Sequence, residues 1–149
     1  MLILMRHGEA SWDTYSDDMG RQLTASGVAF VGQQRVRYQP QLASVQRVIS
    51  SSYARARQTT ALMLEGMPDV EWVIDDRWSP EASLSDAMDS LEEHWVENLL
   101  VVTHQPIIGY AVCFLLEGNT CSPEPLLPGQ LVTLNLLWPG RASAMRLSL

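Results

Sequence analysis

The sequence has 149 residues, about the length of one domain, so a hydrophobic core can form without disulfides. Its ten basic side chains are all arginines, which excludes Schiff-base chemistry and a Walker-type phosphate loop because both need a lysine. The net charge of −7 opposes a general nucleic-acid binder, and no apolar run approaches the roughly 20 residues of a membrane span. We therefore expect a globular protein with no nucleic-acid or membrane partner.

Cysteines and histidines are too few and too scattered for a disulfide framework or a metal site. The sequence has two cysteines, Cys113 and Cys121, and three histidines that lie far apart. The apolar run Leu2–Met5 is too short for a signal peptide. We therefore expect reduced thiols, no metal, no cofactor and a cytoplasmic location.

The first half of the chain alternates strand and helix patterns. Met1–Met5 is a continuous apolar run, which is typical of a buried strand in a mostly parallel sheet. Thr24 has the character of an N-cap, so a helix is expected from there to a point before Pro40. A second strand is expected at Val45–Ile49, followed by a helix at Ala54–Leu64 that uses its alanines and leucines for packing.

The second half repeats this alternation and ends in a hairpin. A third strand at Val70–Ile74 precedes an amphipathic helix at Leu84–Glu97, and the apolar run Leu99–Val102 predicts a fourth strand. The remaining expected elements are a helix at Ile107–Leu116 and paired strands at Leu131–Leu137 and Ala144–Leu147. The pattern predicts one domain, residues 1–149, with an α/β fold: a three-layer α/β/α sandwich around a mostly parallel sheet.

Polar residues follow the ends of several predicted strands. Arg6 and His7 follow the first strand, Arg55 begins the second helix, His104 follows the fourth strand, and Arg21 lies on the first loop. Ligands of open α/β sheets bind outside the carboxyl ends of the strands, so we expect these residues to share one crevice. The planar arginine fork matches phosphate oxygens bidentately. The sequence therefore predicts a phosphate-binding pocket that contains two histidines.

Four blocks of sequence stand at these predicted strand ends and helix starts. They are Arg6-His7-Gly8-Glu9-Ala10, Leu23-Thr24-Ala25-Ser26-Gly27, Ser51-Ser52-Tyr53-Ala54-Arg55-Ala56-Arg57-Gln58-Thr59 and Thr103-His104-Gln105-Pro106-Ile107-Ile108-Gly109. In this order along the chain they resemble the histidine phosphatase superfamily, and the likeness runs from Leu2 to about Tyr110. The shortness of the chain, with no insertion for a lid, most resembles the SixA-type phosphohistidine phosphatases. The resemblance implies a phosphoglycerate mutase-like fold with short loops.

The resemblance also implies roles for the pocket residues. His7 would be the nucleophile that attacks phosphorus, and Arg6 and Arg55 would clamp the phosphoryl oxygens. His104 would complete the pocket and, as a cation, stabilise the charge of the transferring group. A neutral His7 is required for attack, and neighbouring cations favour that form.

Further residues near these motifs are assigned to the phosphate site or to the surface. Gly8 and Arg21 are expected to contact the phosphate, although an arginine close to aspartates could equally form a surface ion pair. Arg57 lies two residues beyond Arg55 on a different face of the helix, so it is expected to face solvent. His94 is expected on the polar side of its helix, at the surface.

The proton donor for the leaving group is missing from its usual place. Relatives of the phosphoglycerate mutase type place a glutamate there, whereas this sequence has Pro80, with Glu81 one residue later. General acid catalysis typically contributes about 10²–10⁴-fold, so an enzyme without it should prefer a labile leaving group. The P–N bond of phosphohistidine meets that requirement. Glu81, Asp13 or Asp18 could alternatively supply the acid.

We therefore expect a metal-independent phosphatase that removes phosphate from the phosphohistidine of a phosphotransfer protein. That substrate would be a signalling or carrier protein. One alternative is a phosphomonoesterase or mutase that acts on a small phosphate ester through the same intermediate on His7. A second alternative is a noncatalytic phosphate-recognition module.

Overall fold

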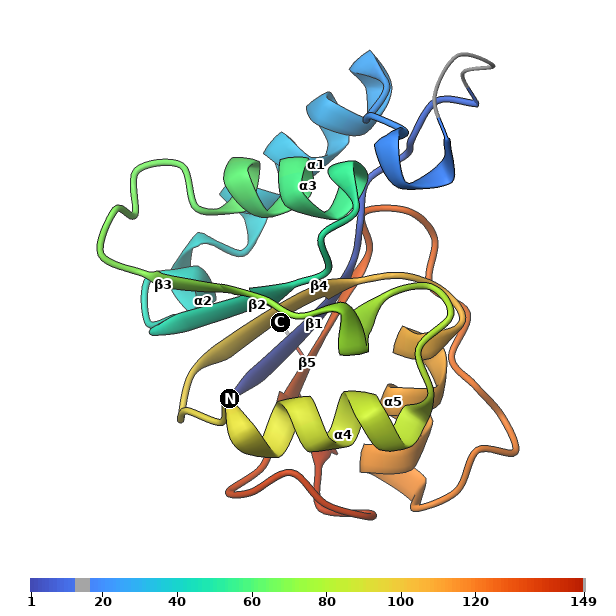
Figure 1. Ribbon diagram of the computed structural model, residues 1–149. Coiled ribbons are helices and arrows are strands. Elements are labelled where there is room, and N and C mark those ends of the chain that lie inside the picture. Colours follow the sequence, from blue (N-terminus) through green and yellow to red (C-terminus); the bar gives the residue numbers. More distant parts are fainter. Residues whose placement is uncertain (13–16, 149) are drawn as a thin grey trace.

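The computed structural model describes residues 1–12 and 17–148, which fold around one six-stranded sheet of order β3-β2-β4-β1-β5-β6 (Figure 1). The first four strands are parallel, and β5 and β6 pair antiparallel as the expected C-terminal hairpin. The mostly parallel sheet expected from the sequence is therefore confirmed. The strands are β1 (Leu2–Arg6), β2 (Arg47–Ser50), β3 (Glu71–Ile74), β4 (Leu99–Thr103), β5 (Leu131–Asn135) and β6 (Met145–Arg146).

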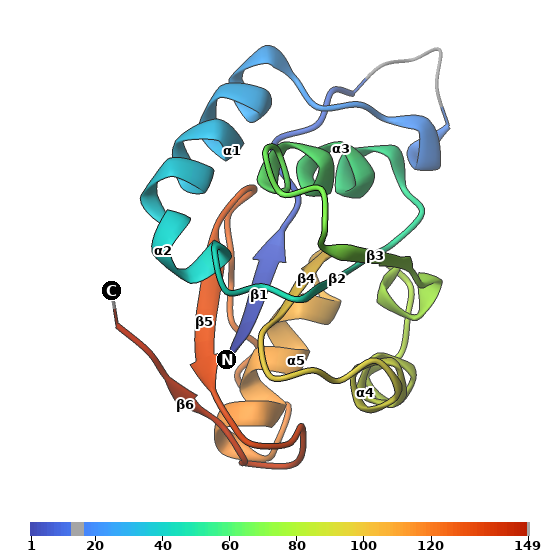
Figure 2. The ribbon, with the colours of Figure 1, turned by 90° about the vertical axis from the view of Figure 1, so that its left-hand side faces the viewer.

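Helices cover both faces of the sheet, so the predicted three-layer sandwich is also confirmed (Figures 1 and 2). One face carries α1 (Ala25–Arg37), α2 (Gln39–Leu42) and α3 (Ala54–Met63), and the other carries α4 (Leu84–Glu93) and α5 (Ile107–Glu117). Short 3₁₀ turns occur at Asp18–Gly20 and Asp76–Trp78. No helix among the described residues is both long and apolar enough to cross a membrane.

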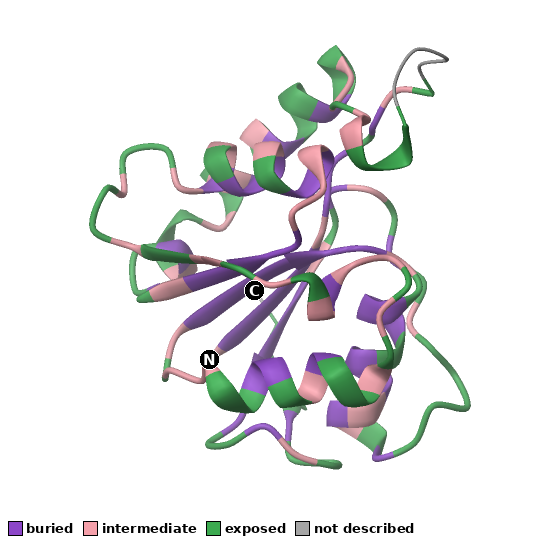
Figure 3. Ribbon diagram, in the orientation of Figure 1, coloured by how far each residue is buried: buried purple, intermediate pink, exposed green. Residues whose placement is uncertain are grey.

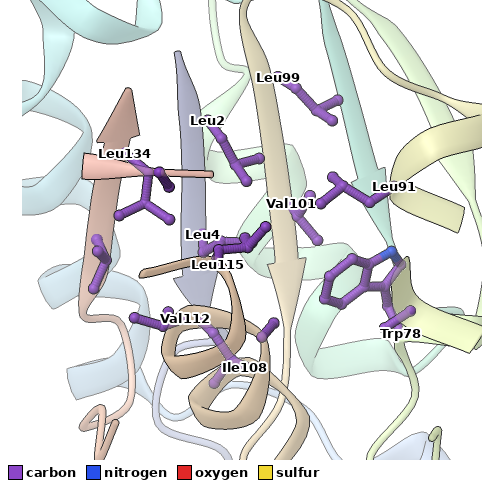
Figure 4. Packing of buried hydrophobic residues seen from close by; sticks show 14 of the residues in the cluster. Leu2, Leu4, Trp78, Leu91, Leu99, Val101, Ile108, Val112, Leu115 and Leu134 are labelled. Atoms are coloured by element: carbon purple, nitrogen blue, oxygen red, sulfur yellow. The ribbon is translucent and has the colours of Figure 1, made fainter. Parts of the chain in front are cut away.

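The two helical layers explain why the central strands are apolar at every position. Leu2 and Leu4 of β1 pack with α4 and α5, whereas Ile3 and Met5 pack with α1, α2 and α3. Successive side chains of a strand point to opposite faces, so a strand that is covered on both sides needs no polar position. Figure 3 shows the buried sheet between the two layers, and Figure 4 shows Leu2 and Leu4 beside α5.

The helix that begins at Thr24 forms as expected. The Thr24 hydroxyl accepts a hydrogen bond from the Gly27 amide at 2.9 Å, which caps α1. The helix ends before Pro40, as predicted, and Pro40 then lies in the first turn of the short helix α2, which the sequence pattern did not predict.

Helix α3 buries a more polar face than expected. Its buried residues include Arg55, Thr59 and Thr60, whereas Ala61 is exposed and Ala54 is only partly buried. The expectation that alanines and leucines form its packing face is therefore confirmed for Leu62 and Leu64, which pack against the core beside the buried Ala56, and wrong for Ala61. The first turns of α3 lie beside the carboxyl edge of the sheet, so the inward face of this helix borders polar groups there.

The strand order brings distant parts of the chain to one edge. Strands β2, β4 and β1 are adjacent and parallel, so their carboxyl ends lie at the same edge of the sheet. The segments that follow them begin at His7, Ser51 and His104. The connections from β2 to α3 and from β4 to α5 are only three residues long, residues 51–53 and 104–106. Short connections hold these side chains close to the rigid sheet.

Candidate active site

His7 is held in one tautomer directly after β1. Its Nδ1 lies 2.7 Å from the Gly8 carbonyl oxygen, and Arg55 Nε donates to its Nε2 at 3.3 Å. A carbonyl can only accept and a guanidinium can only donate, so Nδ1 carries the hydrogen and Nε2 keeps a lone pair. The nitrogen with the lone pair therefore faces the guanidinium of Arg55.

Burial keeps this imidazole uncharged. The pKa of His7 is lowered from 6.5 to about 4, and desolvation is the largest cause. The hydrogen bond to Gly8 opposes this shift, and the positive charges of Arg55, Arg6 and Arg21 contribute to it. At neutral pH the ring is therefore in the neutral form that a nucleophile needs.

Arg55 is 5% exposed and lies in the first turn of α3. Besides its contact with His7, it donates from Nη1 to the Asp18 carbonyl oxygen at 2.6 Å and from Nη2 to Asp18 Oδ2 at 3.3 Å. The side chain is thus oriented from three directions, which matches the preorganisation expected of a phosphate clamp.

Only part of the Arg6 guanidinium has hydrogen-bond partners. Its Nη1 donates to the Leu126 carbonyl oxygen at 2.7 Å, while its buried Nε has no hydrogen-bond partner among the described residues. Burial and the neighbouring charge of Arg55 both lower the pKa of Arg6. Two like charges that share a partly buried site are destabilising unless an anion joins them, so this arrangement favours an anionic ligand.

His104 follows β4 and faces His7, with 4.9 Å between the ring centroids. Its Nε2 lies 2.6 Å from Ser51 Oγ, and its Nδ1 has no partner among the described residues. Burial, followed by the proximity of His7, Arg55 and Arg6, lowers the pKa of His104 far below 6.5. His104 is therefore neutral in this structure, which corrects the expectation of a cation.

Arg21 forms an ion pair and also borders the site. Its Nη1 lies 3.0 Å from Asp18 Oδ1, its Nε donates to the Ser11 carbonyl oxygen at 2.8 Å, and its guanidinium stacks 3.7 Å from the Trp12 ring centroid. Because the same Asp18 carboxylate also contacts Arg55, the ion pair lies at the rim of the site. The ion pair of Arg21 with an aspartate is therefore confirmed, and its contact with a phosphate stays a prediction.

The structure distinguishes between the candidate proton donors. Partial burial opposes ionisation of Asp18, but hydrogen bonds and charge from Arg21 and Arg55 outweigh it and lower the pKa of Asp18. Asp18 is therefore ionised at neutral pH, which contradicts its interpretation as a general acid. Glu81 is exposed, and its charge adds to burial in raising the pKa of Tyr53. Asp13 lies outside the described residues.

Two further basic residues lie away from the site. Arg57 is exposed, as expected. His94 is partly buried rather than fully at the surface, with its Nε2 3.5 Å from Asp75 Oδ2. It caps the C-terminal end of α4, just before β4 begins, and thus lies toward the edge of the sheet opposite His104.

Sequence reasoning missed the role of Thr59. Its hydroxyl accepts a hydrogen bond from the Gly8 amide at 3.0 Å and donates to the Arg55 carbonyl oxygen at 2.8 Å. A residue four positions after Arg55 lies on the same helix face, so the spacing contained this signal. Because its amide already has a partner, Gly8 as a phosphate ligand stays a prediction. A Cβ at Gly8 would meet Val31 Cγ2 at 2.8 Å, so packing also favours glycine.

The assembled residues present hydrogen-bond donors and positive charge to a bound group. Two guanidinium groups and two neutral imidazoles meet at the carboxyl edge of the sheet, although the chain as a whole has a net charge of −7. Within residues 1–12 and 17–148, no cluster of three or more His, Cys, Asp or Glu side chains is arranged to hold a metal ion. The arrangement is suited to holding a phosphoryl group beside an imidazole lone pair.

Comparisons with known proteins agree with this geometry. The model of the histidine phosphatase superfamily (branch 1) matches residues 2–81. The chain is 28% identical over 123 residues to the phosphohistidine phosphatase SixA of Escherichia coli (strain K12), covering 80% of this chain and 76% of the relative. It is 31% identical over 155 aligned positions to the SixA homolog of Haemophilus influenzae, covering 95% and 90%.

Solved structures show the same fold. The structure of the protein histidine phosphatase SixA complexed with tungstate matches with a TM-score of 0.82 at 22% identity, covering 99% of this chain and 94% of the other. A phosphoserine phosphatase from Entamoeba histolytica in complex with 3-phosphoglyceric acid matches with a TM-score of 0.67 at 16% identity, covering 99% and 94%. The family model covers more than half of the chain and includes His7 and Arg55. This chain therefore belongs to the histidine phosphatase superfamily, branch 1.

Proposed function

We propose that this protein hydrolyses phosphohistidine on a phosphotransfer protein through a covalent phosphohistidine intermediate on His7. One observation carries the proposal: the buried, neutral His7 keeps Nε2 unprotonated, and its lone pair accepts a long hydrogen bond of 3.3 Å from Arg55 Nε, which a phosphoryl oxygen takes over when Nε2 attacks phosphorus. A nucleophile next to a cation that can hold the electrophile is the minimum that phosphoryl transfer requires.

The reaction has two steps. In the first, His7 Nε2 forms a bond to phosphorus, the P–N bond to the substrate imidazole breaks, and the leaving nitrogen keeps the bonding pair while the leaving ring takes a proton from solvent water. In the second, water attacks phosphorus, the bond to His7 breaks, and inorganic phosphate leaves. Arg6 and Arg55 hold the nonbridging oxygens in both steps, where charge spreads over three oxygens. These cations belong to the chain itself, and we propose that no metal takes part.

In this reaction His104, whose ring faces that of His7, acts as a neutral imidazole. If the Ser51 hydroxyl donates to Nε2, which lies 2.6 Å away, Nδ1 carries the hydrogen and is a buried donor without a partner among the described residues. A buried donor without a partner is costly, and a phosphoryl oxygen would satisfy it. His104 therefore binds the transferring group as a hydrogen-bond donor rather than as a fixed cation.

The choice of phosphohistidine rests on the leaving group. Pro80 cannot transfer a proton, Asp18 is ionised, and Glu81 is exposed. An imidazole leaving group needs little help beyond its own protonation, whereas an alkoxide needs a general acid. The likeness to two SixA proteins supports the same substrate class.

A phosphate ester is the second candidate substrate. The exposed carboxyl group of Glu81, whose charge acts on Tyr53, favours it as a proton donor for a leaving alkoxide. The fold shared with a phosphoserine phosphatase is compatible with this alternative. The intermediate on His7 would be the same.

The test compares substrates on the purified protein. We expect faster turnover of a phosphohistidine-bearing protein than of phosphoserine or 3-phosphoglycerate, with equal rates in the presence and absence of a chelator. Faster turnover of the esters would overturn the substrate assignment. A trapped, acid-labile phosphoenzyme that disappears in His7→Asn would support the nucleophile. Unchanged turnover in His7→Asn, or no phosphoenzyme from any phosphorylated donor, would overturn the proposed mechanism.

A further inference from the structure

We propose that Asp18 is a specificity-determining residue, whose carboxylate bridges Arg21 and Arg55 so that the site rejects substrates with a second anionic group beside the phosphate. This inference rests on the proposed function, because it assumes that the phosphoryl group binds at Arg55 and His7. It names the property of the leaving group that the site selects, which the family assignment leaves open.

The carboxylate of Asp18 contacts both arginines at once. Oδ1 lies 3.0 Å from Arg21 Nη1, and Oδ2 lies 3.3 Å from Arg55 Nη2. The Asp18 backbone oxygen accepts a further hydrogen bond from Arg55 Nη1 at 2.6 Å. The Asp18 side chain is 55% exposed, so its charge is also presented to an approaching ligand.

The turn that carries Asp18 is held by hydrogen bonds that do not involve the Asp18 carboxylate. The Asp17 side chain accepts a hydrogen bond from the Gly20 amide at 2.8 Å and caps the 3₁₀ turn. The turn therefore does not depend on the Asp18 carboxylate for its local structure. Replacement of that carboxylate should change the charge at the rim and leave the turn in place.

Asp18 leaves Arg55 able to bind a phosphoryl group but removes Arg21 as a second anion site. On Arg55, phosphoryl oxygens have to replace the two contacts of 3.3 Å, from Nη2 to Asp18 Oδ2 and from Nε to His7 Nε2, while the backbone contact of Nη1 keeps the guanidinium in position. Arg21 is held by Asp18, by the Ser11 carbonyl oxygen and by the ring of Trp12. Its charge is therefore neutralised within the protein.

The site therefore selects substrates by the charge that they carry beside the phosphoryl group. In 3-phosphoglycerate a carboxylate lies next to the phosphate. Arg21 is already paired with Asp18, so it does not bind this carboxylate, and the negative charge of Asp18 repels it. A phosphohistidine ring carries no anionic group beside the phosphoryl group, so the charge of Asp18 does not repel it. The exposed position of Asp18 means that salt screens this effect, so we expect a change of about fivefold rather than of several orders of magnitude.

The experiment measures binding by calorimetry, so that it does not depend on turnover. The probes are inorganic phosphate, 3-phosphoglycerate and glycerol 3-phosphate; the last two differ by a carboxylate against a hydroxymethyl group. In Asp18→Asn we expect the affinity for 3-phosphoglycerate relative to glycerol 3-phosphate to rise about fivefold, and the gain to shrink in high salt. Asp17→Asn removes the same charge one residue away without a contact to either arginine, and should leave the ratio near that of the unmodified protein.

Two results would overturn the inference. One is an unchanged ratio in Asp18→Asn, or an equal change in Asp17→Asn, since the effect would then not come from the bridging carboxylate. The other is loss of binding of all three probes in a folded Asp18→Asn, which would make Asp18 a structural support for Arg55. Failure of the proposed function looks different: no phosphoenzyme would form on His7, whatever the binding ratio.

Discussion

The strongest quantitative consequence of the structure concerns the stability of the protein in mild acid. The perturbation is His7→Asn, in which the amide nitrogen can occupy about the place of Nδ1 and still donate to the Gly8 carbonyl oxygen. The folded protein lowers the pKa of His7 to about 4, whereas an unfolded histidine titrates near about 6.5. At pH values between these two, His7 binds a proton in the unfolded chain and does not bind it in the folded chain.

The sign follows from proton linkage. Because the unfolded state binds more protons, the free energy of unfolding falls as the pH falls from about 6.5 to about 4, and this contribution is fully present above that range. A shift from 6.5 to about 4 corresponds to a loss of about 3 kcal/mol at pH 4 that the unmodified protein suffers and His7→Asn does not. Other groups titrate in both proteins and cancel in the difference.

The assay is urea-induced unfolding of both proteins at a series of pH values from 4 to 7.5, with NMR titration of the His7 ring as an independent measurement. We expect the curves of unfolding free energy against pH to separate below pH 6.5, with the unmodified protein losing more. Parallel curves, or a His7 ring that titrates near 6.5, would refute the reasoning. The same pKa keeps the nucleophile neutral, so phosphoenzyme formation should not decline through protonation of His7 until the pH approaches 4.

Three further predictions concern single contacts. Arg55→Lys keeps the charge but loses the planar guanidinium that contacts His7 and Asp18. In steady-state kinetics kcat/KM should therefore fall by at least about 100-fold. A smaller fall would contradict the proposal that Arg55 clamps the phosphoryl group. Gly27→Ala places a Cβ 2.3 Å from the Glu9 carbonyl oxygen and should lower the free energy of unfolding by about 1–3 kcal/mol. The control Gly32→Ala has no atom within 4 Å and should stabilise α1 by up to about 1 kcal/mol. Thr24→Ala removes the N-cap of α1 and should cost about 1 kcal/mol in the same denaturation assay; no change would mean that the cap is dispensable.

The sequence by itself was sufficient for the layers and for the location of the site. Continuous apolar runs such as Leu99–Val102 indicated strands covered on both faces. The alternation of strands with helices predicted the mostly parallel sheet that the structure has. Parallel strands place their carboxyl ends at one edge, so the proximity of Arg6, His7, Arg55 and His104 could be expected before any coordinates. These inferences succeed because hydrophobic periodicity is a local property of the chain.

Only the tertiary structure decided the charge states and the partners of those residues. The neutral form of His104 depends on burial and on cations from other elements, which no local pattern records. The contact of Asp18 with Arg55 joins a loop turn to a helix 37 residues away, and it changed Asp18 from a candidate acid into an ionised bridge. A titratable group takes its pKa and its role from whatever surrounds it in space, and the sequence order of those surroundings carries no such information.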